Sequence, residues 1–576
     1  MKRVLLVAIA MVVSFVPAGA SGDSDPVVDN EWALTDPPAN TPSTGIWFSE
    51  PVLQPSSTSY LTSYPECSGT WEECAAKEKR SEHICKSVWT ETCATETQIA
   101  YSAFLPKCKD DLDTNCIESV WVRIGDKKVY GELESYMPKS SPLHFAGDKT
   151  INLPEGKSTS LWRFAPGAVD DQEHLLSLSA RLHGRSAEKP FVKFPTPSRL
   201  EVVIDPVRIH KGNYQIPYAS TTGNGWSITG GYTRERDGTF GSTYIGFCSA
   251  IDTGVCARRQ NSIKGARYGT TLRLMDPPAA WLSGRLKDPS FDITSKNDSF
   301  LWSIEADPLI VPVASAWIPN TDVENVFPGR KLSRKEETSW TGPLSRGDKA
   351  LRDFLSWEKF IGDKAGALHS RWSLESIQDS SLLFNGKSLK ECLSNDRVAG
   401  IVTSNAMVFQ DSPPKWNAFE NAFDYVVAGP HLLPDGQENL GLYRVKLNQQ
   451  FARCVYGLSD VPIVATVSVI GEGVVRKVAT SSIQSSEDWI NLAISGFTYS
   501  SPTIRFKLQT ATPGLIPTPT PTPTPAASTS PTTAPSPASS PTVISSKKVT
   551  ITCVKGKQTK KVSGANPKCP QGFKKK

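Results

Sequence analysis

Residues 119–130 read SVWVRIGDKKVY and give the clearest fold signal in the chain. β-branched and aromatic residues stand on both sides of Gly125-Asp126, a dipeptide of the kind found in two-residue β-hairpin turns. The segment therefore predicts a β-hairpin, with one strand before Gly125 and one after Asp126.

Short runs rich in β-branched and aromatic residues recur along the chain, and prolines and polar turns separate them. The strands predicted before residue 320 are 200–209, 227–232, 243–248, 270–275 and 300–317. Those predicted after it are 463–470, 474–480, 489–494 and 503–508. Repeated short strands without long helices between them are typical of antiparallel sandwiches and barrels.

One segment has clear helical periodicity between a capping residue, Asp348, and a stop signal, Gly362. Its apolar residues are Ala350, Leu351, Phe354, Leu355 and Ile361. A weaker helical pattern covers residues 416–427. The predicted fold class is mainly β, with two β-sandwich-like domains and a few short helices. We expect a disulfide-stapled β-rich domain at residues 21–320 and a second β-rich domain with a helical insert at residues 321–512.

The twelve cysteines favour local disulfides, because an even number in an exported protein is typical of disulfides. The C-x2-4-C clusters of zinc sites are absent from the sequence, and we predict no metal and no cofactor. Short loops and then elimination favour the pairs Cys67–Cys74, Cys85–Cys93, Cys108–Cys116, Cys248–Cys256, Cys392–Cys454 and Cys553–Cys569. The six amino-terminal cysteines allow 15 connectivities, so other pairings stay open. Cys454 is expected on a strand at residues 451–455.

The chain begins with the pattern of a secretory signal peptide. Lys2 and Arg3 precede an apolar run at residues 4–16, and small residues end at Ala20. We expect cleavage after Ala20, no transmembrane segment in the mature protein, and a secreted, extracellular or cell-wall-associated location. The apolar run is short for an uncleaved membrane anchor, which is the less favoured interpretation.

An uncharged segment at residues 513–546 separates the body from the tail, and its first part reads PGLIPTPTPTPTPAASTSPTTAPSPASSPT. Proline at alternate positions favours an extended polyproline II spacer, so we predict a linker without a folded core. At roughly 3.1 Å per residue, the stretch from Pro517 to Thr542 spans up to about 80 Å. Its composition also permits O-glycosylation.

The tail, residues 547–576, contains ten lysines and no acidic residue, a charge of +10. The whole chain has a net charge of +5 and the signal peptide +2, so the rest of the mature chain is acidic, at −7. A small β module stapled by Cys553 and Cys569 is expected here. Its candidate polyanion-binding residues are Lys547, Lys548, Lys555, Lys557, Lys560, Lys561, Lys568, Lys574, Lys575 and Lys576. The alternative is a tail that only increases solubility.

The ending TCVKGKQTKKV...NPKCPQGFKKK, together with the signal peptide, the C-x7-C loops and the Thr/Pro linker, resembles a group of secreted or surface proteins from actinobacteria. The functions of that group are mostly uncharacterised. The resemblance is specific over about 30 residues of the tail and looser over the body. It implies export and association with the cell wall, and it supplies no catalytic residues.

Motifs that carry catalytic chemistry are absent from the sequence, including G-x-S-x-G, H-E-x-x-H and G-x-G-x-x-G. Carboxylates that could pair for glycoside hydrolysis are Glu201 with Asp205 and Glu305 with Asp307. The loop between Cys108 and Cys116 could offer Ca²⁺ the oxygens of Asp110, Asp111, Asp113 and Asn115, but a solvated acidic turn is the favoured interpretation. The seven histidines lack ligand or triad spacing.

The sequence thus predicts a secreted, non-enzymatic surface or binding protein that its basic tail holds on an anionic polymer of the cell envelope. Nucleic acid is not expected as its physiological partner. The alternative is a secreted hydrolase that acts on polysaccharide or peptidoglycan, with the tail as a targeting module. The ligand of the body and the oligomeric state stay open.

Overall fold

The computed structural model separates the chain into two compact units, Met1–Leu515 and Ile516–Lys576. The residues that it describes are 38–48, 58–64, 83–94, 98–169, 174–186, 193–211, 216, 218–222, 225–229, 248–277, 280–326, 338–341, 347–377, 383–393, 398–410, 413–458, 463–471, 474–476, 480–485, 489–499, 503–510, 549–555, 558–564 and 574–575. The first unit is the body and the second contains the tail.

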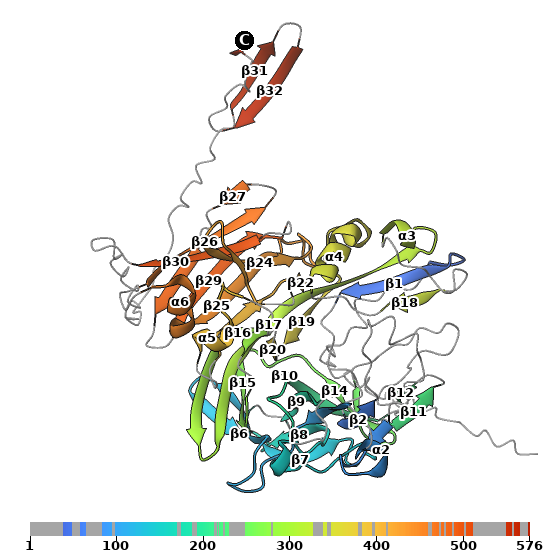
Figure 1. The fold of residues 1–576 in the computed structure, drawn as a ribbon. Helices are drawn as coiled ribbons and strands as arrows, with labels where there is room; N and C mark the ends of the chain where they lie inside the picture. The colour runs from blue at the N-terminus through green and yellow to red at the C-terminus, as the bar shows by residue number, and fades with distance from the viewer. Residues whose placement is uncertain are drawn as a thin grey trace, which may run out of the picture. The chain divides into compact units, whose positions relative to one another are not determined.

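The body is built mainly from β-strands, as the sequence predicts, and a continuous path of hydrogen-bonded strands runs through it (Figure 1). The path passes through β3 (His83–Cys85), β2 (Tyr60–Tyr64), β4 (Gln98–Phe104), β9 (His174–Ser186), β10 (Arg199–Lys211), β20 (Ser373–Ile377), β16 (Trp281–Lys296), β21 (Gly400–Ser404), β25 (Leu440–Asn448), β29 (Trp489–Thr498) and β28 (Thr480–Ser485). All of these neighbours are antiparallel except β16 and β21, which are parallel.

Other strands attach to this path. At its first half lie β7 (Glu132–Met137), β8 (Thr159–Phe164), β13 (Cys248–Asp252) and β14 (Val255–Arg259). The second half of β16 leaves the path and joins β17 (Ser299–Pro319), β15 (Ala266–Leu274), β5 (Cys116–Ile124) and β6 (Lys127–Tyr130). The far half of β17 pairs with β19 (Ala367–Arg371) and β1 (Ser43–Phe48), and β1 pairs with β18 (Ser339–Thr341). A separate hairpin joins β11 (Tyr218–Thr222) and β12 (Gly225–Thr229).

The hairpin predicted at residues 119–130 is confirmed. β5 ends at Ile124 and β6 begins at Lys127, and these two residues are register partners. Gly125 has a φ of +57°, a left-handed backbone conformation that glycine adopts without steric cost. The apolar side of β5 faces a core, since Val120 and Val122 are buried.

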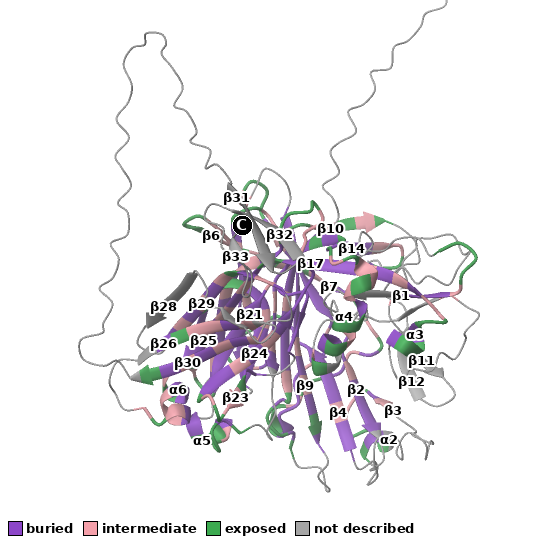
Figure 2. Ribbon diagram, turned by 90° about the horizontal axis from the view of Figure 1, so that it is seen from above, coloured by how far each residue is buried: buried purple, intermediate pink, exposed green. Residues whose placement is uncertain are grey.

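A first hydrophobic core lies between the strands at the start of the path and the group β5, β15 and β17. It contains large side chains from both sides, such as Trp162 and Leu178 on one side and Tyr268 and Trp302 on the other. The buried parts of these strands gather in the middle of the body (Figure 2). This arrangement is a β-sandwich.

A second core lies between the end of the path and a smaller sheet. That sheet contains β22 (Val408–Phe409), β24 (Ala422–Ala428), β30 (Thr503–Thr510), β26 (Ile463–Gly471) and β27 (Val474–Arg476), with β23 (Lys415–Asn417) beside β24. Phe423 and Phe506 stack in this core with ring centroids 5.0 Å apart. A second sandwich is therefore present, as the fold class predicts.

The two sandwiches are not separated at residue 320, where the sequence placed a boundary. β19 and β20 follow that position, yet they pair with β17 and with β10 and β16. Strand β16 serves both cores, because Leu282 and Leu286 pack in the first core and Trp281 packs in the second. Strands β18 and β19, which follow residue 320, pair with strands of the first sheet, so the chain after that position continues the same hydrogen-bonded unit.

Helices are few and short in the described part of the body. They are α2 (Glu91–Ala94), α3 (Val323–Val326), α4 (Gly347–Ile361), α5 (Leu389–Cys392), α6 (Gln449–Tyr456) and the 3-10 helix η2 (Lys149–Ile151). None of the helices in this part of the chain has the length and apolar character needed to cross a bilayer.

Helix α4 confirms the predicted helix, and Gly362 follows it with a φ of +63°. Its core-facing residues include Phe354 and Trp357, which are 1% and 0% exposed. Leu355 was predicted on this face but is 53% exposed. The prediction is wrong there because Trp357, three residues after Phe354, continues the buried stripe.

The helix predicted at residues 416–427 is wrong, because β23 and β24 occupy this segment. A turn at residues 418–421 separates the two strands, and Asn421 has a φ of +52° there. The strand predicted around Cys454 is also wrong, since this residue lies on α6. Asn448 caps α6 by accepting a hydrogen bond from the Phe451 N–H at 3.0 Å.

Three of the expected disulfides are present: Cys85–Cys93, Cys108–Cys116 and Cys392–Cys454. Cys256 is also disulfide-bonded, and its expected partner Cys248 lies on the neighbouring strand, although the Cys248 side chain is outside the described part. The expected pair Cys67–Cys74 and the residue Cys569 lie outside the described residues. The signal peptide, the linker and the part of the predicted strand 243–248 before Cys248 lie outside them too.

Candidate functional site

The tail contains a small three-stranded antiparallel sheet in the order β32, β31, β33. Its strands are β31 (Val549–Lys555), β32 (Gln558–Gly564) and β33 (Lys574–Lys575). Thr, Val and Ile alternate in VTITCV, a pattern that favours strands, and residues 556–557 connect β31 to β32. The predicted strands of the tail are present.

This sheet brings together five of the ten candidate lysines: Lys555, Lys560, Lys561, Lys574 and Lys575. Lys560 and Lys575 are both register partners of Cys553, one on each side of the central strand. Neighbouring strands lie about 4.8 Å apart, so the sheet holds these positions close together. The other candidates, Lys547, Lys548, Lys557, Lys568 and Lys576, lie outside the described residues.

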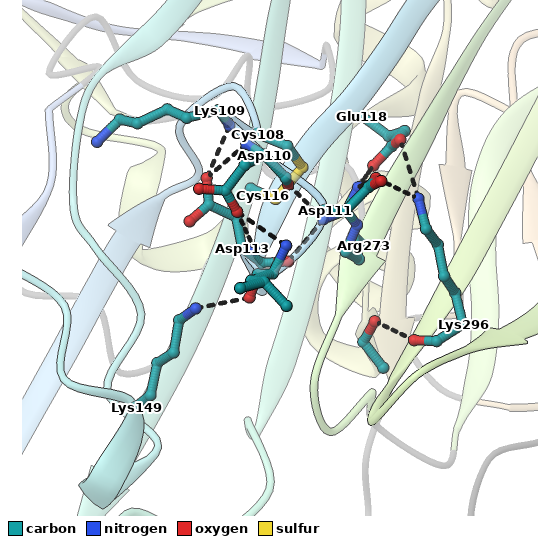
Figure 3. A network of polar contacts seen from close by, with 12 residues as sticks. Cys108, Lys109, Asp110, Asp111, Asp113, Cys116, Glu118, Lys149, Arg273 and Lys296 are labelled. Carbon is teal, nitrogen blue, oxygen red and sulfur yellow. Dashed lines mark hydrogen bonds and ion pairs between the residues drawn. A yellow bond between two sulfur atoms is a disulfide. The ribbon is translucent and has the colours of Figure 1, made fainter.

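The second candidate site is the acidic loop between Cys108 and Cys116 (Figure 3). Asp113 accepts hydrogen bonds from the Lys109 N–H at 2.7 Å and from the Asp110 N–H. Asp110 in turn accepts from the backbone N–H groups of Leu112 and Asp113. These two carboxylates therefore close the turn on itself, as the favoured interpretation of a structural acidic turn requires.

Asp111 and Asn115 also have partners outside the loop. Lys296 donates to the Asp111 carboxylate at 2.8 Å, and this hydrogen bond lowers the pKa of Asp111. Asn115 accepts from the Met275 N–H at 3.1 Å. The loop's oxygens therefore point to separate partners and do not converge as cation ligands.

Arg273 of β15 fastens this loop to the first sandwich. Its side chain is 2% exposed and donates to the carbonyls of Asp110 and Asp113 at 2.7 and 3.0 Å. The same guanidinium forms an ion pair with Glu118. Figure 3 shows Asp111, Glu118, Arg273 and Lys296 as one connected network. The arrangement fixes the position of the disulfide loop on the sheet.

A cavity of about 130 Å³ lies beside the same loop. Its lining includes Lys109, Asp113, Lys149 and Glu155. Lys109 Nζ lies 3.6 Å from the Glu155 carboxylate, and Lys149 donates to a backbone carbonyl. Charges of both signs line the cavity and pair with each other or with the backbone, so the cavity has room for a small polar group but no selectivity for one sign of charge.

The carboxylates that a glycosidase would need are held in ion pairs. Glu201 pairs with Arg181 and Arg199, and Asp205 pairs with Arg259 at 2.8 Å. Burial opposes ionisation of Glu201, but a hydrogen bond from His183 and the two arginines lower its pKa well below the usual range. A general acid for glycoside hydrolysis requires a raised pKa, so Glu201 has the wrong protonation state for that role.

The second carboxylate pair, Glu305 and Asp307, is also held by arginines. Glu305 accepts hydrogen bonds from the Trp121 indole at 2.6 Å and from Arg123 at 2.9 Å. These contacts lower its pKa against the opposing effect of burial. Arg267 lies between Glu305 and Asp307 and pairs with both. These residues stabilise the face of the β5–β15–β17 group.

No protein-family model matches this chain, and no curated protein is detectably similar to it.

Proposed function

We propose that the protein is a secreted, non-enzymatic binding protein that its basic tail holds electrostatically on an anionic polymer of the cell envelope. The observation that carries this proposal is the tail sheet, which belongs to a compact unit separate from the body. Five of its sixteen strand residues are lysines. With no acidic residue between 547 and 576, no internal carboxylate neutralises this charge.

The physical basis is the repulsion between like charges on neighbouring strands. A phosphate- or carboxylate-rich polymer relieves this repulsion and releases its own counterions, so it binds a compact cation in a salt-dependent way. The mature chain outside the tail carries the opposite net charge, so an anionic polymer attracts the tail and not the rest of the protein.

A hydrolase is the less favoured function. The four carboxylates that the sequence offered for glycoside hydrolysis are held by arginines in the body. They stabilise the sheets in which they lie, and this accounts for their presence without catalysis.

The test is a binding assay on isolated cell walls across a salt series, with the full-length protein and a version ending at Thr512. We expect the full-length protein to bind at low salt and to lose at least about tenfold in bound fraction between low and high salt. The truncated version is expected to stay unbound. Equal binding by both versions, or binding by neither, would overturn the proposal.

A matched pair of charge variants makes the assay specific. One variant carries Gln at the five lysines of the tail sheet: Lys555, Lys560, Lys561, Lys574 and Lys575. The control carries Gln at five exposed lysines of the body: Lys86, Lys127, Lys193, Lys264 and Lys287. Both lose the same charge, so only the tail variant should release the protein from the walls at lower salt.

A further inference from the structure

A cluster of possible metal ligands lies in the body, away from both candidate sites. Glu358 lies on α4, Asp363 follows the Gly362 turn at its end, and His431 lies in the loop after β24. The His431 Nδ1 atom is 2.7 Å from Asp363 Oδ2 and 3.8 Å from Glu358 Oε1. One ligand atom from each residue lies within 4.8 Å of the others.

The backbone holds these three residues in place. Leu432 N–H donates to the Asp363 carbonyl at 3.2 Å, and Ala365 N–H donates to the Leu432 carbonyl at 2.8 Å. His431 N–H donates to Asp363 Oδ1 at 2.8 Å. The loop after β24 is therefore tied to the segment that follows α4, so Asp363 and His431 are positioned before any ion binds.

The cluster is open to solvent. The side chains of Glu358, Asp363 and His431 are 30%, 42% and 35% exposed, so an ion can reach it. Two carboxylates and one imidazole are a common donor set for zinc and similar ions.

We propose that Glu358, Asp363 and His431 form a binding site for one divalent transition-metal ion such as Zn²⁺. One imidazole nitrogen and two carboxylate oxygens are its ligands, and the ion replaces the hydrogen bond that joins His431 Nδ1 to Asp363. Positions not taken by the three side chains are open to water or to a ligand of the body. Calcium is a poor candidate because it requires six or more oxygen ligands and does not favour imidazole.

Calorimetric titration of the full-length protein with Zn²⁺ tests the site. We expect one high-affinity ion per chain and at least about tenfold weaker binding in E358Q and in H431Q. E324Q on α3 removes an exposed carboxylate elsewhere and serves as the control, with binding expected to be unchanged. Ca²⁺ should not compete.

A thermal melt with and without Zn²⁺ gives a second measurement, because an ion that binds only the folded state raises its melting temperature. The rise should occur in the wild type and in E324Q and be absent in E358Q. Zinc binding that is equal in wild type and E358Q, or no zinc binding by the wild type, would overturn the proposal. If H431Q does not fold, E358Q still decides, because His431 keeps its hydrogen bonds to Asp363 in that variant.

Discussion

Cys392 and Cys454 are 62 positions apart in the chain, and their disulfide joins the end of α5 to α6 with the Cα atoms 5.5 Å apart. Both helices contribute to the second core, where Cys392 is buried beside residues such as Phe451 and Val455. The bridge therefore closes a long loop that contains β21 to β25. Removal of this disulfide should therefore lower the free energy of unfolding more than removal of a disulfide that closes a short surface loop.

We predict that replacing Cys392 and Cys454 with alanine lowers the free energy of unfolding by roughly 4 kcal/mol. The same change at Cys108 and Cys116, which are 8 positions apart, should cost roughly 2.5 kcal/mol because it frees a shorter loop. Urea unfolding of both double variants measures the two values. An equal or smaller loss for the longer loop contradicts this explanation.

Strands in which apolar and polar residues alternate strictly could be predicted from the sequence. Strand β24 shows where this pattern stops being decisive. Ala422, Phe423, Tyr425 and Val427 are buried in it, a spacing close to that of a strand, but the segment is too short to exclude a helix without the turn before it. Phe419 extends the apolar pattern of this segment, and yet it is 94% exposed in that turn.

Helix α6 was missed although its capping residues can be read in the sequence. Asn448 stands at its start, and Gly457 follows it with a φ of +65°. The metal-ligand cluster could not be predicted, because Asp363 and His431 are 68 residues apart and only the packing of α4 beside the β24 sheet brings them together. The basic character of the tail could be read from the sequence because its ten lysines are concentrated in thirty residues.

We predict that Trp357→Ala lowers the free energy of unfolding by about 3 to 5 kcal/mol. Trp357 is fully buried where α4 packs on the body, and its loss leaves a large cavity. Leu355→Ala on the same helix is the control, and it should cost less than about 1 kcal/mol because Leu355 is 53% exposed. Chemical denaturation followed by circular dichroism separates the two. Similar losses of stability in the two variants would show that the buried face of α4 is assigned incorrectly.

We predict that Glu201→Gln destabilises the body by about 3 kcal/mol at pH 7, since it removes the buried carboxylate charge that Arg181 and Arg199 share. The folded-state pKa of Glu201 lies below its unfolded value, so its contribution is present above about pH 4.3 and is lost as the pH falls further. The difference between wild type and variant should therefore shrink below pH 4. Glu134→Gln breaks an exposed pair with Arg163 and should cost under about 1 kcal/mol.

His144 gives a prediction in a different pH range. Its Nε2 atom lies 2.7 Å from Ser158 Oγ, and burial, with a contribution from Lys157, lowers its pKa to about 4. As the pH falls from about 6.5 to 4, His144 is therefore protonated in the unfolded chain before it is protonated in the folded protein. The free energy of unfolding decreases over that window. We expect His144→Gln to reduce this decrease by on the order of 1 kcal/mol, less than the full pKa shift implies, because solvent screens a partly exposed ring. Urea unfolding at pH 7, 5.5 and 4.5 measures it, and parallel pH profiles for the two proteins would show that the His144 environment does not drive the acid sensitivity.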